Sequence, residues 1–208
     1  MENNEQTIEK KDPYAYQKPI QLVMNVIILV LVAILLVRIF FLSSVTIQQT
    51  SMYPTFNDGD KVLVNKLAKV QRGDVVVFFD KDVNMPKFTM TFSFLSGDAK
   101  LLIKRVVATE GDEIWLERVG FGTYQLRIKI AQTGEIIDET YYIAPDGNEV
   151  VLADLTNQTA GVLWGKTQQN PYVIEQGNFF AIGDNRQDSI DCRVYGQIPT
   201  SRICGVVI

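Results

Sequence analysis

The chain has 208 residues, a formal net charge of −4, two cysteines and no histidine. Because histidine is absent, the chain can form neither a Ser-His-Asp triad nor a Cys-His pair, and lysine becomes the favoured general base for any nucleophile. The common catalytic zinc sites also use histidine, so we expect no metal. The acidic balance and the lack of a long basic run argue against nucleic acid as a partner.

The two cysteines, Cys192 and Cys204, have no metal-ligand spacing and are too few for a disulfide framework. They could pair with each other outside the cell. Two small buried thiols are an equally good interpretation. The sequence leaves both alternatives open.

A long apolar segment follows a short polar tail. Residues 1–18 carry charges of both signs and are typical of a disordered tail. Residues 19–43 are almost continuously apolar, and at about 1.5 Å per residue such a helix crosses about 30 Å of hydrocarbon. A cleaved signal peptide would have a shorter apolar core followed by small residues, whereas Arg38 and bulky apolar residues occur here. We therefore predict an uncleaved transmembrane anchor.

The cations around the anchor predict its orientation. Lys10, Lys11 and Lys18 precede it, and Arg38 is the only cation close to its other end. Cytoplasmic flanks carry an excess of lysine and arginine. We expect a single-pass protein of the cell membrane, with residues 1–18 in the cytoplasm and residues 44–208 outside it.

Beyond the anchor, short apolar runs are typical of strands. The expected strands cover residues 45–47, 62–64, 75–79, 101–107, 114–116, 124–130, 140–143, 150–152, 179–182 and 203–208. Turns rich in Gly and Asp separate them, and no convincing amphipathic helix interrupts them. We predict a mainly β domain over residues 44–208, with a variable insertion over residues 115–176 in which we find no motif. Residues 80–100 are unusually apolar and predict either a hairpin on the core or a surface that dips into the membrane interface.

Residues 51–56 (SMYPTF) follow the anchor closely. Pro54 fixes its own φ and disfavours the helical region for Tyr53, which predicts a rigid, extended turn. This turn would hold the Ser51 hydroxyl close to the membrane surface. Serine and threonine beside proline are also ordinary loop chemistry, so the hexapeptide alone proves little.

Lys104 lies in the strand predicted over residues 101–107. Strand alternation puts Leu102 and Val106 on its face. Burial between aliphatic side chains lowers the pKa of a lysine, and a neutral amine can activate a serine hydroxyl where no histidine exists. A lysine that reaches into water from a strand edge fits the local pattern at least as well.

Several stretches taken together are far more specific. They are residues 51–55 (SMYPT), 73–78 (GDVVVF), 104–107 (KRVV) with Gly111 and Asp112, and 183–193 (GDNRQDSIDCR). In this order they closely resemble the conserved boxes of the type I signal peptidases, membrane-bound serine endopeptidases with a Ser/Lys dyad. The single span resembles the form found in Gram-positive bacteria. The resemblance covers nearly all of the chain and implies a signal-peptidase-like β fold, cleavage of signal peptides from exported preproteins, and no cofactor or metal.

The resemblance also implies roles for individual residues. Ser51 matches the nucleophile, Lys104 matches the general base, and Ser189 matches a serine that orients the lysine. The residues that would brace or position this site are Asp184, Asp191, Arg193, Arg105, Met52 and Pro54. The substrate would lie extended along a strand edge, with small side chains at its −1 and −3 positions in shallow pockets.

Three positions depart from the family pattern. Cys192 stands where a serine is usual, and Glu110 stands where a proline is usual. Gln49 stands where some members have a serine whose hydroxyl joins the backbone N–H of Ser51 in the oxyanion hole. Gln49 could donate through its amide, or the second donor could be missing. One such donor is worth about 3–4 kcal/mol in a well-studied protease.

Two other functions stay open. One is a non-cleaving or dedicated homologue that acts as an assembly factor for surface-fibre (pilus) subunits. Gln49 is its only support, and the retention of both Ser51 and Lys104 counts against it. The other is a self-cleaving Ser/Lys regulator of the repressor type, against which the N-terminal span counts strongly.

Overall fold

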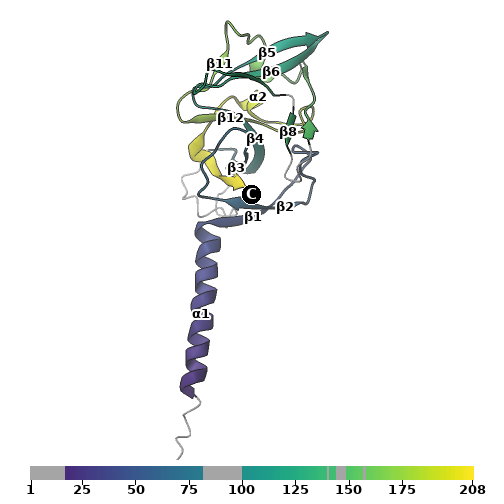
Figure 1. Cartoon of the computed structure of the whole chain (residues 1–208). Helices are drawn as coiled ribbons and strands as arrows, with labels where there is room; N and C mark the ends of the chain where they lie inside the picture. The colour runs from purple at the N-terminus through teal and green to yellow at the C-terminus, as the bar shows by residue number, and fades with distance from the viewer. Residues whose placement is uncertain (1–16, 82–99, 140, 144–148, 157) are drawn as a thin grey trace, which may run out of the picture.

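The computed structural model describes residues 17–81, 100–139, 141–143, 149–156 and 158–208. Its first element, α1 (Gln17–Phe40), projects away from a β domain (Figure 1). Within these residues, Pro19–Phe40 is the one helical stretch long and apolar enough to cross a membrane. Its 22 residues reach about 33 Å at about 1.5 Å each. The helix ends before residue 43, the end of the predicted anchor, because the chain turns into the first strand.

The junction between α1 and the β domain is short and hydrogen-bonded. Strand β1 (Leu42–Thr46) begins almost at once after the helix. Lys66 donates from Nζ to the carbonyl of Ile39 at 2.7 Å and from its backbone N–H to the carbonyl of Phe41 at 2.9 Å. The last carbonyls of a helix have no partner within the helix, and a cation there is favourable. Lys66 therefore ties the end of the anchor to the sheet.

The main sheet has seven strands, all of whose neighbouring pairs are antiparallel, in the order β1-β2-β14-β3-β4-β12-β13. Its other members are β2 (Lys61–Asn65), β3 (Val75–Phe79), β4 (Leu101–Thr109), β12 (Asn178–Ile182), β13 (Ile198–Pro199) and β14 (Ile203–Val207). Every residue of β3 is buried, which explains why this strand is continuously apolar instead of alternating.

A second sheet lies at the end of the β domain remote from α1 (Figure 1), and most of it falls within residues 115–176, over which an insertion was predicted. Its strands are β5 (Glu113–Gly120), β6 (Thr123–Lys129), β7 (Ile136–Asp138), β10 (Leu155–Thr156) and β11 (Tyr172–Val173), and β8 (Tyr141–Ile143) and β9 (Glu149–Val151) form a separate pair. The paired strands β5 and β6 are its longest members.

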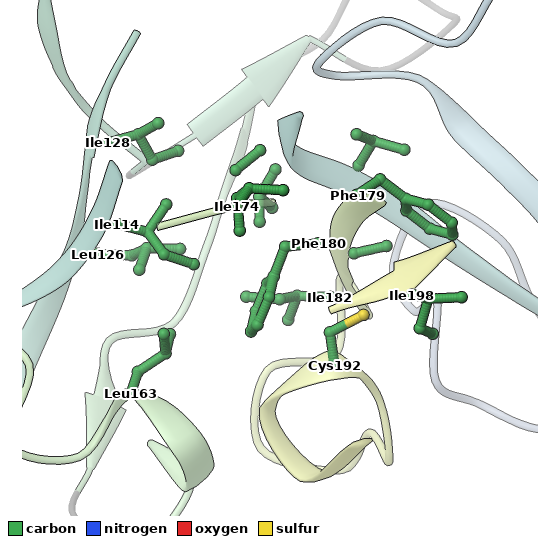
Figure 2. Close-up of a cluster of buried hydrophobic side chains, with 14 of the residues drawn as sticks. Ile114, Leu126, Ile128, Leu163, Ile174, Phe179, Phe180, Ile182, Cys192 and Ile198 are labelled. Atoms are coloured by element: carbon green, nitrogen blue, oxygen red, sulfur yellow. The ribbon is translucent and has the colours of Figure 1, made fainter. Parts of the chain in front are cut away.

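Two apolar clusters cover the faces of the main sheet. In the larger one, Ile114 and Leu126 of the second sheet pack toward Phe180 of β12 (Figure 2). In the smaller one, Met52 and Ile47 pack with Val77 and the other β3 residues that alternate with those of the larger cluster. Because successive strand residues point to opposite faces, β3 contributes to both clusters. The larger cluster joins the two sheets into one core.

The prediction of a mainly β domain with one N-terminal helix is confirmed. The strand predicted over residues 75–79 has the observed bounds, whereas β7, β10, β11, β13 and the short helix α2 (Cys192–Tyr195) were not predicted. Such short elements lack a repeat long enough to show periodicity. The predicted polar tail and the predicted apolar hairpin fall almost wholly on residues 1–16 and 82–99, outside the described residues.

The cysteine alternatives are resolved by burial. Cys192 and Cys204 are both buried and free, so the prediction of buried thiols is confirmed and the pairing is wrong. Burial raises the pKa of the Cys192 thiol to about 12. It packs in the larger cluster as a small apolar side chain (Figure 2).

Candidate active site

Ser51 lies on the turn between β1 and β2. The N–H of Tyr53 donates to the carbonyl of Thr50 at 3.0 Å, and the N–H of Phe56 donates to the carbonyl of Met52 at 3.0 Å. The predicted turn is confirmed, but these bonds make it compact instead of extended. Met52 is fully buried in the smaller cluster and anchors the turn, whereas Pro54 lies exposed on it.

Lys104 comes from the middle of the main sheet, where it lies opposite Val76 of β3. Its Nζ donates to Ser51 Oγ at 2.7 Å and to the carbonyl of Ile103 at 2.8 Å. Ser51 and Lys104 are 9% and 3% exposed. The two side chains therefore meet where little of either is exposed to solvent.

The burial of Lys104 changes its proton affinity. Desolvation disfavours the ammonium form and lowers the pKa of Lys104 to about 8, although the carboxylates of Asp191 and Asp184 act in the opposite direction. A substantial fraction of the amine is thus neutral at mildly alkaline pH. Because 2.7 Å suits a hydrogen bond in either direction, the neutral amine can also accept the Ser51 proton.

A groove with a volume of about 860 Å³ opens beside this pair. Residues 42–47 and 100–104 line it, together with Gln49, Ser51 and Arg38. Strand β1 is the edge of the main sheet, and β4 pairs with β12 only from Arg105 onward. Among the described strands, residues 101–104 therefore have a partner on their β3 side alone. The edge of β1 and the unpaired edge of residues 101–104 in β4 therefore face the groove with backbone N–H and C=O groups.

A buried ion pair links the strand of Lys104 to the loop that follows β12. Arg105 donates to both oxygens of Asp184, from Nε and Nη2, each at 2.8 Å. Its Nη1 donates to the carbonyl of Gly73 at 2.7 Å, and the Thr55 hydroxyl also donates to Asp184. Asp184 thus joins β4 to the turn that carries Ser51.

A second buried pair closes the same loop. Arg193 donates from Nε and Nη2 to Asp191 at 2.9 and 2.8 Å, and Asp191 also accepts the N–H of Gly183 at 3.0 Å. Burial opposes the ionisation of Asp191, but the hydrogen bonds and charge of Arg193 outweigh it and hold the pKa of Asp191 below its ordinary value. Asp191 is therefore a carboxylate that fixes the loop beside Lys104.

Comparison with known proteins decides the family. The family described as "Signal peptidase, peptidase S26" matches residues 20–208. The chain belongs to this family. Signal peptidase I of Aquifex aeolicus is 28% identical over 202 residues, covering 85% of this chain and 78% of that protein. Signal peptidase I of Bacillus licheniformis is 27% identical over 188 residues, covering 86% of this chain and 81% of that protein.

Longer relatives and solved structures are also similar. Thylakoidal processing peptidase 1 of Arabidopsis thaliana is 28% identical over 165 residues, which are 77% of this chain but 39% of that protein. The chain therefore spans about two fifths of the length of this chloroplast relative. A crystal structure of a signal peptidase I from Enterococcus faecalis V583 is 25% identical and covers 68% of this chain and 98% of its own, with a TM-score of 0.37.

Among the described residues, no hydrogen bond joins Ser189 to Lys104, the residue that it would orient in the signal peptidase pattern. The hydrogen bonds of Lys104 go to Ser51 and Ile103, and Ser189 Oγ is buried near Asp191 with no hydrogen bond of normal geometry to any described residue. Ser189 Oγ lies instead against Gly183, where the Cβ of any other residue would overlap it and the carbonyl of Ser51. This close approach explains why a glycine stands at position 183.

The departures from the signal peptidase pattern have local consequences. Gln49 has a φ of 80°, which is uncommon for a residue with a Cβ, and its backbone N–H donates to Asp58 at 2.7 Å. Its side chain is exposed at the groove, and its amide has no hydrogen bond to any residue that the structure describes. Glu110, in place of the usual proline, accepts the N–H of Gly177 at 2.8 Å.

The structure also reveals supporting residues to which the sequence assigned no role. Asn185 donates from its backbone N–H to the carbonyl of Ser51 at 3.1 Å and from Nδ2 to the carbonyl of Thr50 at 3.2 Å. Asn185 could have been noticed in the sequence because it lies within the motif of residues 183–193. Thr55 belongs to the serine motif in the same way, but Glu139, which pairs with Arg186, stands in the insertion and gives no signal.

Proposed function

We propose that the chain is a signal peptidase I that cleaves signal peptides from exported preproteins, with Ser51 as nucleophile and Lys104 as general base. The observation that supports this most strongly is the 2.7 Å contact between Lys104 Nζ and Ser51 Oγ, with the lysine pKa lowered to about 8 by burial. No histidine is available as a rival base. Family membership supplies the substrate class.

The proposed reaction follows from the contact. Neutral Lys104 takes the proton of the Ser51 hydroxyl, and Ser51 Oγ attacks the carbonyl carbon of the last signal-peptide residue. The lysine then gives its proton to the leaving amine, which is the N-terminus of the mature protein. Water attacks the resulting ester after giving a proton to the same lysine, and the proton returns to Ser51. No metal or cofactor takes part.

The developing oxyanion needs donors in place before the reaction. The backbone N–H of Ser51 is suited to this role, since it bonds to no acceptor among the described residues. Gln49 lines the same groove and is the candidate for a second donor through its side-chain amide. The substrate would add as an extended strand between the edges of β1 and residues 101–104 of β4, with its small −1 and −3 side chains directed into the groove.

Cleavage of a preprotein is the direct test. The detergent-solubilised chain should release the mature protein from an exported preprotein. Mass spectrometry of the products should show a cleavage site with small side chains at positions −1 and −3. The Ser51→Ala variant should release none. Binding of the preprotein without cleavage by the unaltered chain would contradict the proposal and favour the non-cleaving assembly factor.

We also propose that α1 crosses the cell membrane with residues 1–18 in the cytoplasm, residues 19–43 as the anchor and residues 44–208 outside. The lysines before residue 19 and the exposed apolar surface of α1 support this arrangement. Lipid is then a partner of the anchor, and nucleic acid is not a partner of this acidic chain. The placement of Lys66 against the end of α1 would keep the groove near the membrane surface, where signal peptides emerge.

Protease added to intact cells measures this orientation. We expect it to degrade the part of the chain after residue 43 and to leave an epitope tag placed before residue 19 intact, because only the former is outside. Permeabilised cells, in which both parts are cut, provide the control. A protected β domain in intact cells would reverse the orientation and rule out cleavage at the outer face.

A further inference from the structure

The loop after β12 holds the nucleophile from one side. Asn185 bonds to the carbonyls of Ser51 and Thr50, and the Thr50 hydroxyl donates to Asp188 at 3.3 Å. The position of the Ser51 backbone therefore depends on where residues 183–188 lie. These residues have no regular secondary structure, so turn hydrogen bonds and side-chain contacts hold them.

The other side of this loop is held by the insertion. Arg186 is 2% exposed, and its Nη1 and Nη2 donate to the two oxygens of Glu139 at 2.7 and 2.6 Å. Arg186 Nε has no partner, so among the described residues Glu139 is its one carboxylate contact. Gln187 adds a weaker tie, from Nε2 to the carbonyl of Asp154 at 2.8 Å.

Glu139 is itself hydrogen-bonded to the second sheet. It follows β7, and its backbone N–H donates to the carbonyl of Leu126 in β6 at 3.1 Å. Leu126 is buried in the cluster that joins the two sheets (Figure 2). A continuous chain of contacts thus runs from this core through Glu139, Arg186 and Asn185 to the Ser51 carbonyl.

We propose that Glu139 is a positioning residue for the cleavage reaction, which sets the place of Ser51 through Arg186 and the loop of residues 183–188. A buried cation that loses its partner must move toward water or take up a new partner. Arg186 lies next to Asn185, so such a movement displaces the bonds to Ser51. This inference rests on the proposed function for its kinetic consequence, but not for its structural one.

Glu139→Gln is the sharpest variant, because it keeps the size of the side chain and removes its charge. We expect kcat per folded molecule to fall by about 10- to 100-fold with KM unchanged, since a displacement of about 1 Å at a reacting group has effects of this size. Amide hydrogen exchange should become faster in peptides that contain residues 50–52 and 183–188. The folded fraction is measured from the near-ultraviolet circular dichroism of buried Trp115.

Glu113→Gln is the matched control. Glu113 lies on β5 of the second sheet, but its side chain is 32% exposed and pairs with Lys129, whose side chain is 43% exposed. We expect unaltered kcat and unaltered exchange, because exposed pairs contribute little. The double variant Glu139→Met/Arg186→Met leaves no unpaired charge, so it should recover part of the exchange protection that Glu139→Met alone loses.

Three outcomes would overturn the inference. They are unaltered kcat and exchange in Glu139→Gln, a loss of activity that only follows the folded fraction, and no recovery in the double variant. If the unaltered chain cleaves no preprotein, the proposed function fails, and the exchange experiment still decides whether Glu139 positions the Ser51 loop.

Discussion

Ser51→Ala and Lys104→Ala should each lower kcat/KM by more than about 10⁴-fold, the order of loss when a serine protease loses one member of its catalytic unit. Without Ser51 there is no nucleophile. Without Lys104, no other base among the described residues lies within hydrogen-bond distance of the Ser51 hydroxyl. Because the two side chains act as one unit, the double variant should be no worse than either single variant. Cleavage of a preprotein at saturating and limiting concentrations measures all three.

Lys129→Ala is the matched control for the lysine. Lys129 also lies on a strand, but its side chain is 43% exposed and it pairs with Glu113 at the surface. Its removal should leave kcat/KM unaltered. If Lys104→Ala kept most of its activity while Ser51→Ala lost it, the assignment of the base would be wrong. If the losses of the two single variants multiplied in the double variant, the two residues would not act as a unit.

The elements of the β domain were predictable where burial is regular. Residues 75–79 are apolar without interruption because both faces of β3 are covered. The second sheet was less predictable, since β7, β10 and β11 have two or three residues each and depend on pairing with β5 and β6. Such pairing is a property of the folded chain and leaves no local pattern.

The site divides in the same way. Ser51 and Lys104 could be named because both stand in motifs, yet their contact joins residues 53 positions apart and is visible only in the fold. The Arg186–Glu139 pair spans 47 positions, and its acidic member looks like any surface glutamate in the sequence. Among the described residues, no hydrogen bond joins Ser189 to Lys104, and the Ser189 hydroxyl lies against Gly183.

After the loss of Ser51 or Lys104, the change with the largest expected effect on cleavage is a change of pH. Only the neutral form of Lys104 can accept the Ser51 proton, so kcat/KM should rise with pH through the folded pKa of about 8. Two pH units below that value, about 1% of the lysine is neutral, and activity should be about 100-fold lower than its plateau. If the base were an exposed lysine, the rise in kcat/KM would be centred near about pH 10.4, and if it were a histidine, near about 6.5.

The same shift has a consequence for stability. The folded pKa of Lys104, about 8, lies below the ordinary value of 10.5, so the unfolded chain binds more protons between these values. The contribution of Lys104 to stability therefore grows as pH rises through this window and is lost as pH falls through about 8. Cys192, with its pKa raised to about 12 from 9.0, acts in the opposite direction above pH 9.0 because the folded chain keeps its proton.

The pH profile of kcat/KM tests the central claim most directly, because its acid limb reports the base of the free enzyme. The measurement uses a soluble peptide that spans a cleavage site, with the detergent-solubilised chain, and a substrate without groups that titrate in the range. We predict a single acid limb with a midpoint near 8, in agreement with the pKa of Lys104. A limb near about pH 4 would identify a carboxylate as the base and would contradict the Ser/Lys mechanism.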